Sequence, residues 1–172
     1  MTVRKILTEP NKLLRQVSQS VDKVGDEERA IMDDMLDTMY DAFGIGLAAI
    51  QIGVPKRIRV MDISRDEYKK NPMYFVNPVI KNKNEEKAKY EEGCLSVPDQ
   101  FAEIERPNSC EVEYLNYDGK KKLLKADGLL ATCIQHEMDH LEGILFIDYL
   151  SKLKKSMIIK KLSKIKIKRE IL

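Results

Sequence analysis

The chain has 172 residues, of which 43% are apolar and 34% charged, and these values fit a single globular domain with a substantial core. Its first residues do not resemble an export or transit signal, and no apolar run approaches the roughly 18 residues of a membrane span. Three cysteines, an odd number, argue against a disulfide framework and suit a reducing compartment. We therefore expect a cytoplasmic protein with no membrane span.

The net charge of +2 conceals two parts of opposite sign. Residues 151–172 contain nine Lys or Arg and one acid, a net charge of +8, whereas residues 1–150 have a net charge of −6. We expect residues 1–150 to form the domain that carries any active site. Residues 151–172 are expected to form a basic C-terminal helix.

Helical patterns dominate the N-terminal part of the chain. Residues 10–17 indicate a short helical stretch, and Asp26 is expected to cap a helix that runs to about Phe43. Along this helix apolar side chains recur at i, i+4 spacing, while the other face is acidic. The segment 44–53 is rich in small residues, so its backbone can approach another group closely.

Strand patterns occupy the middle of the chain, at 57–63, 73–80, 110–114 and 121–125. Pro78 interrupts the second segment and indicates an edge strand or a bulge, and a turn signal at 117–120 joins the last two into a hairpin. A second long helix is expected at 128–141, capped by Asp127 and stopped by Gly143, with a short strand at 144–147. This order of elements predicts an α+β domain.

The second long helix carries the strongest chemical signal. His136 and His140 are four residues apart and share a helix face, so both imidazoles can point at one metal ion. Glu137 lies beside them, where a general base can reach a water on that ion. The alternative is two surface histidines in this pattern by chance, which is improbable because the chain has no other histidine.

A catalytic site of this kind needs a third protein ligand and an open position. The carboxylates downstream are poor candidates, because Glu142 is too close on the same helix and Glu170 lies near the end of the basic segment. Among the cysteines, Cys133 shares the helix of the histidines and is expected to line a pocket or the core, and Cys110 fits an inward-facing strand position. Cys94 follows a glycine and would complete a set of two histidines and one thiolate, which suits zinc or ferrous iron.

Three segments now stand together: residues 44–51 (GIGLAAIQ), 92–96 (EGCLS) and 135–140 (QHEMDH). In this order they resemble the three signature motifs of peptide deformylases, over about residues 4–150. That family removes the formyl group from the N-terminal formyl-methionine of new polypeptides. The resemblance implies mainly antiparallel strands packed around a central helix that carries the metal motif, with N-terminal helices.

The resemblance also implies a mechanism. Cys94, His136 and His140 would hold the ion, usually ferrous iron in the cell, with zinc, nickel or cobalt as substitutes. The metal would lower the pKa of its water, and Glu137 would accept the proton and return it to the departing amine. Attack of the hydroxide on the formyl carbon would form a tetrahedral oxyanion. This oxyanion would accept hydrogen bonds from the Gln51 side-chain amide and the Leu95 backbone N–H.

Substrate contacts carried over from the family are backbone groups around Ile45, Gly46 and Gly93, which would pair an extended formyl-methionyl peptide as an added strand. The methionine side chain would enter an apolar pocket near Ile45, Leu129 and Cys133. An equally weighted interpretation makes Leu129 a core residue.

Behind the ligands, the resemblance implies that Glu92 and Arg106 hold the cysteine loop in place. The alternative for Arg106 is an ordinary surface strand residue. The chain departs from the family pattern at Ile50, where many members carry Pro, and at Phe43. Thr132 stands at a position that varies among members, which leaves the shape of the pocket open.

The basic segment mixes lysines with apolar residues. One interpretation is a solvated helix that packs on the body by its apolar stripe. The other is contact with a polyanion, since some deformylases bind the ribosome through a basic C-terminal helix, and lysines near phosphates give salt-sensitive affinity. Binding to a membrane surface is a weaker possibility.

Two other functions compete with deformylation. A metalloprotease would need a downstream carboxylate ligand, which is missing. A binding protein with a structural metal would need four protein ligands, and only three are convincing here.

Overall fold

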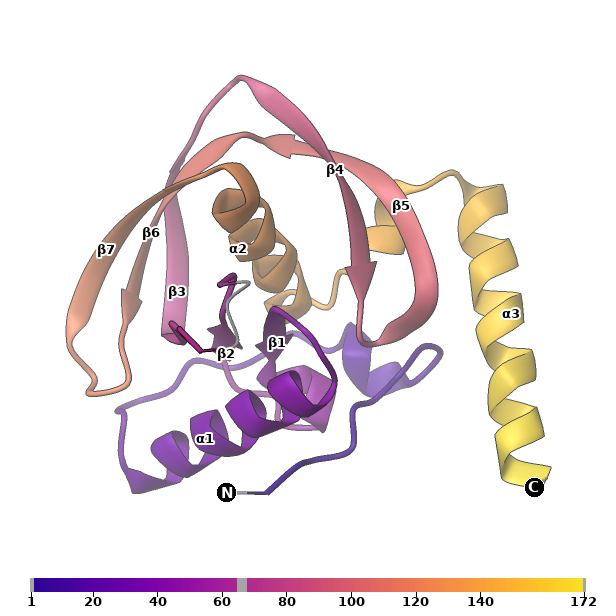
Figure 1. Cartoon of the computed structure of the whole chain (residues 1–172), viewed down its shortest axis with the longest axis horizontal. Helices are drawn as coiled ribbons and strands as arrows, with labels where there is room; N and C mark the ends of the chain where they lie inside the picture. Colours follow the sequence, from indigo (N-terminus) through magenta and orange to yellow (C-terminus); the bar gives the residue numbers. More distant parts are fainter. Residues whose placement is uncertain (1, 65–67, 172) are drawn as a thin grey trace.

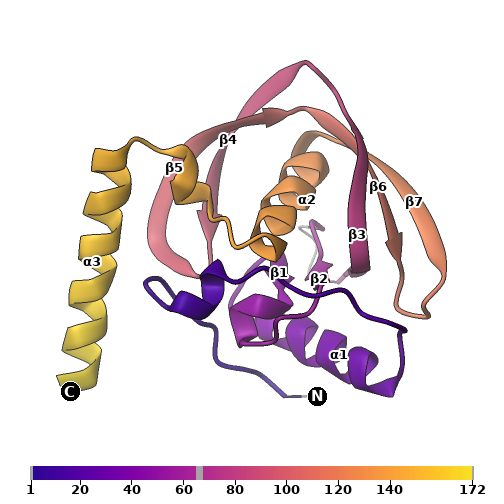
Figure 2. The same cartoon turned by 180° about the vertical axis from the view of Figure 1, so that it is seen from behind.

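The computed structural model describes residues 2–64 and 68–171, with side chains as far as residue 168. Figures 1 and 2 show helix α2 (Gly128–Leu141) in the middle, with the larger sheet on one side and the hairpin of β4 and β5 on the other. The architecture is α+β with antiparallel strands around the central helix, which confirms the predicted fold class.

The larger sheet has five antiparallel strands in the order β1-β2-β3-β6-β7, and β4 pairs with β5 in a separate hairpin. The strands are β1 (Gly46–Ala48), β2 (Ile58–Met61), β3 (Met73–Lys83), β4 (Lys87–Cys94), β5 (Val97–Pro107), β6 (Ser109–Leu115) and β7 (Lys121–Asp127). The four predicted strand segments are confirmed, whereas β1, β4 and β5 were not predicted. The irregularity at Pro78 is a bulge, because the register of β3 against β6 shifts there and β3 is an inner strand.

Helix α1 (Asp26–Asp41) packs on the sheet through Met32, Met35 and Met39, which are fully buried. Two details of its prediction were wrong. The N-cap is Gly25, whose N–H donates to the Glu28 carboxylate at 3.0 Å, so Asp26 is already the first helical residue.

The C-terminal boundary of α1 was also predicted too late. The helix ends at Asp41, and Phe43 follows in a left-handed conformation (φ 55°) with 94% of its surface exposed. The predicted acidic face is not uniformly solvated, because Asp34 is buried against Arg4 at 2.7 Å.

Helix α2 has the predicted bounds and begins after Asp127, the last residue of β7. Its buried residues run along most of its length, because the sheet covers one side and the hairpin the other. Gly143 ends the segment with φ 72°, and a Cβ atom there would collide with the carbonyl oxygen of Arg15. Only glycine fits that close backbone approach.

Short 3-10 helices replace two predicted elements. The stretch at 10–17 is helical only over Lys12–Arg15. The short strand predicted at 144–147 was wrong, because the chain forms a 3-10 helix at Phe146–Tyr149. The Asp148 carboxylate accepts the Leu145 N–H at 3.0 Å and fixes this turn locally.

The C-terminal segment is helix α3 (Lys152–Ile171), as predicted, and Figure 1 shows it on the outer side of β5. Ile158, Ile159 and Leu162 pack on a cluster that includes Ile104 and Phe146. Within the described residues, no helix is both long enough and apolar enough to cross a membrane. The division into a catalytic domain and a separate basic helix stays a prediction.

Candidate metal centre and active site

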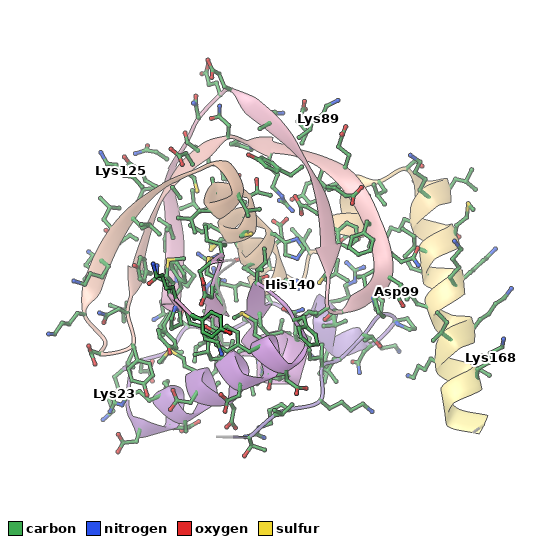
Figure 3. All side chains as sticks on the ribbon, viewed as in Figure 1. Lys23, Lys89, Asp99, Lys125, His140 and Lys168 are labelled. Carbon is green, nitrogen blue, oxygen red and sulfur yellow. The ribbon has the colours of Figure 1, made fainter. Side chains whose placement is uncertain are left out.

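The three predicted metal ligands lie together. His136 and His140 stand one turn apart on α2, with ring centroids 5.1 Å apart, and Cys94 ends β4. Cys94 Sγ is 3.3 Å from His140 Nε2, and the three ligand atoms lie within 4.8 Å of one another. A sulfur and two imidazole nitrogens at this separation suit a zinc-type or ferrous ion, whose bonds to such atoms are about 2.0–2.3 Å long. Figure 3 shows His140 near the middle of the molecule.

The electrostatics of these residues also fit a cation. Burial lowers the pKa of His140 well below its ordinary value, so His140 is neutral and able to bind a metal. Burial opposes a charge on His136 as well, but its hydrogen bonds to Cys94 and Glu92 raise the pKa of His136 well above its ordinary value. Cys94 and Glu92 thus favour a positive charge at the His136 ring, whereas the His140 ring is neutral.

A buried ionic network stands behind His136. The Nδ1 atom of His136 is 2.9 Å from the Glu92 carboxylate, which leaves Nε2 to face Cys94. Arg106 donates to both oxygens of Glu92 at 2.7 and 2.9 Å and to Asp139 at 2.8 Å. Tyr149 donates to Asp139 at 2.8 Å. The alternative of a surface Arg106 was wrong, because the residue is 5% exposed.

Glu137 follows His136 on α2 and is 5% exposed. Burial raises the pKa of Glu137 above its ordinary value, although the charges of His136 and Arg59 oppose the shift. Its Oε2 atom has no hydrogen-bond partner among the described residues. A buried carboxylate with an unpartnered oxygen and a pKa displaced toward neutrality is suited to accept and return a proton.

Gly46 makes room for this carboxylate. A Cβ atom at position 46 would lie 2.6 Å from Oε1 of Glu137. The small-residue segment predicted to approach another group thus approaches the side chain expected to act as acid and base. The strand β1 holds Gly46 there by pairing it with Met61 of β2.

Gln51 is 1% exposed, and its orientation is determined by its neighbours. Its Oε1 accepts the Ala48 N–H at 2.8 Å, so Nε2 must point the other way. Nε2 donates to Ser96 Oγ at 3.0 Å and lies 3.6 Å from Cys94 Sγ. Leu95 occupies the turn that joins β4 to β5, directly after Cys94.

A cavity of about 480 Å³ opens beside these residues. It is lined by Glu137, Gln51 and Leu95 and by all five residues predicted to contact substrate: Ile45, Gly46, Gly93, Leu129 and Cys133. Leu129 was interpreted either as a pocket residue or as a core residue. The structure fits both, since Leu129 lines the cavity and also packs on the core under α2.

Several residues of the site were missed by the sequence analysis. Tyr90, Asp99 and Phe101 line the cavity from the β4–β5 hairpin. Their participation depends on that hairpin, which the sequence analysis did not predict. Asp139 and Tyr149 extend the ionic network, and only the pairing seen in three dimensions reveals them.

Arg59 is a further residue that the strand pattern alone did not single out. Arg59 is fully buried on β2. Its guanidinium donates to the Ile134 carbonyl of α2 at 2.5 Å and lies over the Phe75 ring. Burial lowers the pKa of Arg59 to about 10. It therefore remains charged near pH 7 and ties β2 to the helix that carries the histidines.

The sequence model of the family described as polypeptide deformylase matches residues 3–156. A peptide deformylase from Pelagibacter ubique is 84% identical over 99% of both chains, and one from Phenylobacterium zucineum is 60% identical over 95% of this chain and 97% of its own. The crystal structure of peptide deformylase from Ehrlichia chaffeensis has a TM-score of 0.91 and 42% identity, covering 96% of this chain and 97% of that one. A second structure from that organism, in complex with actinonin, has a TM-score of 0.90 and 46% identity over 95% of this chain and 98% of its own.

Proposed function

Since this chain belongs to the polypeptide deformylase family and is therefore a hydrolase, we propose that it removes the formyl group from N-formyl-methionine at the start of new polypeptides. One observation carries this proposal. Cys94, His136 and His140 converge beside Glu137 at the wall of a cavity large enough for a methionine side chain. The products are formate and a peptide with a free N-terminal amine.

Cys94, His136 and His140 are the proposed metal ligands. One divalent cation held by these atoms would supply an acidified water and would polarise the formyl oxygen. We propose ferrous iron as the ion used in the cell, with zinc, nickel or cobalt able to replace it, because two imidazoles and a thiolate accept all of them. Glu92 fixes the His136 ring from behind, and Arg106 in turn fixes Glu92.

Glu137 is the proposed acid and base. It accepts a proton from the attacking water at a carboxylate oxygen while the water oxygen bonds to the formyl carbon. The C–N bond then breaks, and Glu137 returns the proton to the departing amine. Its burial and unpartnered Oε2 support this role, because no donor among the described residues occupies the oxygen that would accept the proton.

Gln51 and Leu95 are the proposed donors to the oxyanion. The side-chain amide of Gln51 points toward Cys94 and cannot rotate without losing its bond from Ala48. The backbone N–H of Leu95 would be the second donor. Loss of one such donor costs about 2.7–4 kcal/mol of transition-state stabilisation.

The peptide is proposed to bind as an added strand between the backbone of Ile45 and Gly46 on one wall and Gly93 on the other. Its methionine side chain would enter the cavity toward Leu129 and Cys133. Burial raises the pKa of Cys133 to about 12, so this thiol remains neutral and apolar in the pocket.

Formate release from a formyl-Met dipeptide tests the function directly. Wild-type protein loaded with iron or nickel should release formate, Glu137→Ala should be slower by about 10²- to 10⁴-fold, and Cys94→Ser should lose both metal and activity. Glu142→Ala is a matched control, since it lies just beyond the same helix and, among the described residues, its carboxylate bonds only Arg57, on the surface. No formate from the loaded wild type would refute the proposal, and activity in Glu137→Ala would remove only the assigned acid and base.

Helix α3 is proposed to contact the ribosome, where the substrate emerges. Its apolar residues Ile158 and Leu162 pack inward, while Lys160 and Lys164 are exposed. Truncation after Leu150, or Lys160→Glu with Lys164→Glu, should weaken co-sedimentation with ribosomes. Lys120→Glu with Lys122→Glu, at the turn before β7 and at the beginning of that strand, should not. Unchanged binding of the first two variants would contradict the ribosome contact. We also propose a cytoplasmic location, which its three unpaired cysteines support.

A further inference from the structure

The N-terminal segment ahead of the first 3-10 helix bonds to both regions that carry the proposed oxyanion donors. The Leu7 N–H donates to the Gln51 carbonyl at 2.7 Å, and the Glu9 N–H donates to the Ser96 carbonyl at 2.8 Å. Gln51 carries one donor, and Ser96 directly follows Leu95, which carries the other. Figures 1 and 2 show this segment beside the turn between β4 and β5. It therefore ties the two donor regions together.

A side-chain bond makes a second tie between the same two regions. Gln51 Nε2 donates to Ser96 Oγ at 3.0 Å, and both side chains are buried. A side-chain amide nitrogen has two hydrogens. Ser96 takes one of them, so the other is left to point to the Cys94 side, where Sγ lies 3.6 Å from Nε2. A change in the separation of Gln51 and Ser96 would therefore redirect the hydrogen that is proposed to meet the oxyanion.

The carboxylate of Glu9 anchors the N-terminal segment through Arg15. Glu9 is 5% exposed and lies 2.6 Å from Nη2 of Arg15. Nη1 of Arg15 donates to the Asp148 carboxylate at 2.5 Å and to the Gly143 carbonyl at 3.5 Å. The planar guanidinium thus joins the N-terminal segment to the chain that follows α2, with its donors in fixed directions.

Neither Arg15 nor Glu9 has a part in the proposed chemistry, and both are outside the described lining of the cavity. Taking two charges out of water costs free energy that offsets much of their attraction, so burial of this pair is a weak source of stability. The pair instead restricts the N-terminal segment to one position, because the carboxylate must stay within reach of the guanidinium.

We propose that Arg15 and Glu9 are positioning residues for the oxyanion donors. This inference rests on the proposed function. Their ion pair fixes the N-terminal segment, and the N–H groups of Leu7 and Glu9 then hold Gln51 and the turn after Cys94 at one separation. Neither Arg15 nor the Glu9 carboxylate needs to touch the substrate, because the backbone bonds carry the effect to the donors.

The test removes both charges together, and Asp148 keeps its ion pair with Lys155 at 2.5 Å, so no buried charge is left without a partner. Glu9→Gln with Arg15→Met should lower kcat for formate release from a formyl-Met dipeptide about tenfold, less than the ~100-fold cost of a displacement of about 1 Å. KM should hardly change. Arg15→Lys keeps the charge but loses the planar fork, and it should retain more of the activity than the double variant.

Arg57→Met is the matched control. It breaks an ion pair with Glu142 at 2.6 Å, away from the N-terminal segment, and should keep the wild-type kcat.

Two measurements distinguish positioning from a general loss of stability. Gln51→Ala removes the side-chain donor, so removal of the two charges should lower kcat by a smaller factor in that background than in wild type. In metal-free protein, amide hydrogen exchange should be faster at Leu7 and Glu9 of the double variant, with the amides of α2 unchanged.

An equal loss of kcat with and without the Gln51 side chain would overturn the inference, as would unchanged kcat or unchanged exchange in the double variant. Absence of formate from the wild type would instead refute the proposed function, so the two failures are distinguishable.

Discussion

Gly46→Ala is the smallest change that should disable the site, because the added methyl group has no space. Its Cβ would lie 2.6 Å from Oε1, 3.1 Å from Cδ and 3.2 Å from Cγ of Glu137. Neither side can retreat easily, since β1 is paired with β2 and Glu137 is buried on α2. Overpacking of this kind costs about 1–3 kcal/mol, and we expect the free energy of unfolding to fall by that amount.

Activity should fall further than stability. The strain is relieved most easily by displacement of the Glu137 carboxylate, and a shift of about 1 Å in a reacting group can cost about 100-fold in rate. We therefore expect kcat/KM for formate release to drop by about two orders of magnitude. Gly25→Ala is the matched control, because its Cβ would meet nothing closer than Glu28 Oε2 at 3.5 Å, an ordinary contact.

A double-variant cycle isolates the cause. Glu137→Ala removes the three atoms nearest to the new methyl group, so Gly46→Ala should cost little stability when it is made in that background. Urea unfolding of the four proteins gives the coupling energy. The reasoning fails if Gly46→Ala alone keeps wild-type activity, or if its stability loss is the same with and without the Glu137 side chain.

Three further predictions concern the metal and acid stability. Arg106→Met should weaken metal retention against a competing chelator about 10- to 100-fold, as loss of groups behind a ligand does, whereas Arg57→Met, a surface ion pair, should not. Chelation should lower the Tm of wild type, because the metal binds only the folded state, and should hardly change that of Cys94→Ser. Burial alone would raise the pKa of Asp148, but hydrogen bonds from Lys155 and neighbouring donors lower it below its ordinary value. Its contribution to stability is complete above the ordinary Asp pKa of about 3.9 and is lost as pH falls through the lower folded value. The stability gap between wild type and Asp148→Asn, measured by urea unfolding, should be full near pH 7 and should close in acid.

The cluster of Cys94, His136 and His140 could be predicted from the sequence because its geometry is mostly local. A step of four residues is slightly more than one helical turn, so His136 and His140 share a face whatever surrounds the helix. Cys94 was predicted because a catalytic metal site needs three protein ligands and the two histidines supply only two of them. The structure brings its sulfur within 3.3 Å of His140 although the two residues are 46 apart in the chain.

The β4–β5 hairpin could not be predicted in the same way. Its buried positions include the charged Glu92 and Arg106, and its exposed positions include the apolar Phe101, so apolar alternation is weak in both strands. The short strand predicted at 144–147 failed for the opposite reason. A run of four apolar residues does not distinguish a strand from a helical turn. The hydrogen bond from the Leu145 N–H to the Asp148 carboxylate stabilises the helical turn.

The ionic network explains how the unpredicted hairpin reaches its position. Buried charges are costly to desolvate unless each is bonded in good geometry. Arg106 meets this condition, because three of its nitrogens donate to Glu92 and Asp139. These residues lie on β5, β4 and α2, so the network is satisfied only when the hairpin has one position relative to the helix. That position brings Cys94 to the histidines. The third proposed ligand is therefore placed by charges that, read along the chain, resemble an ordinary solvated surface.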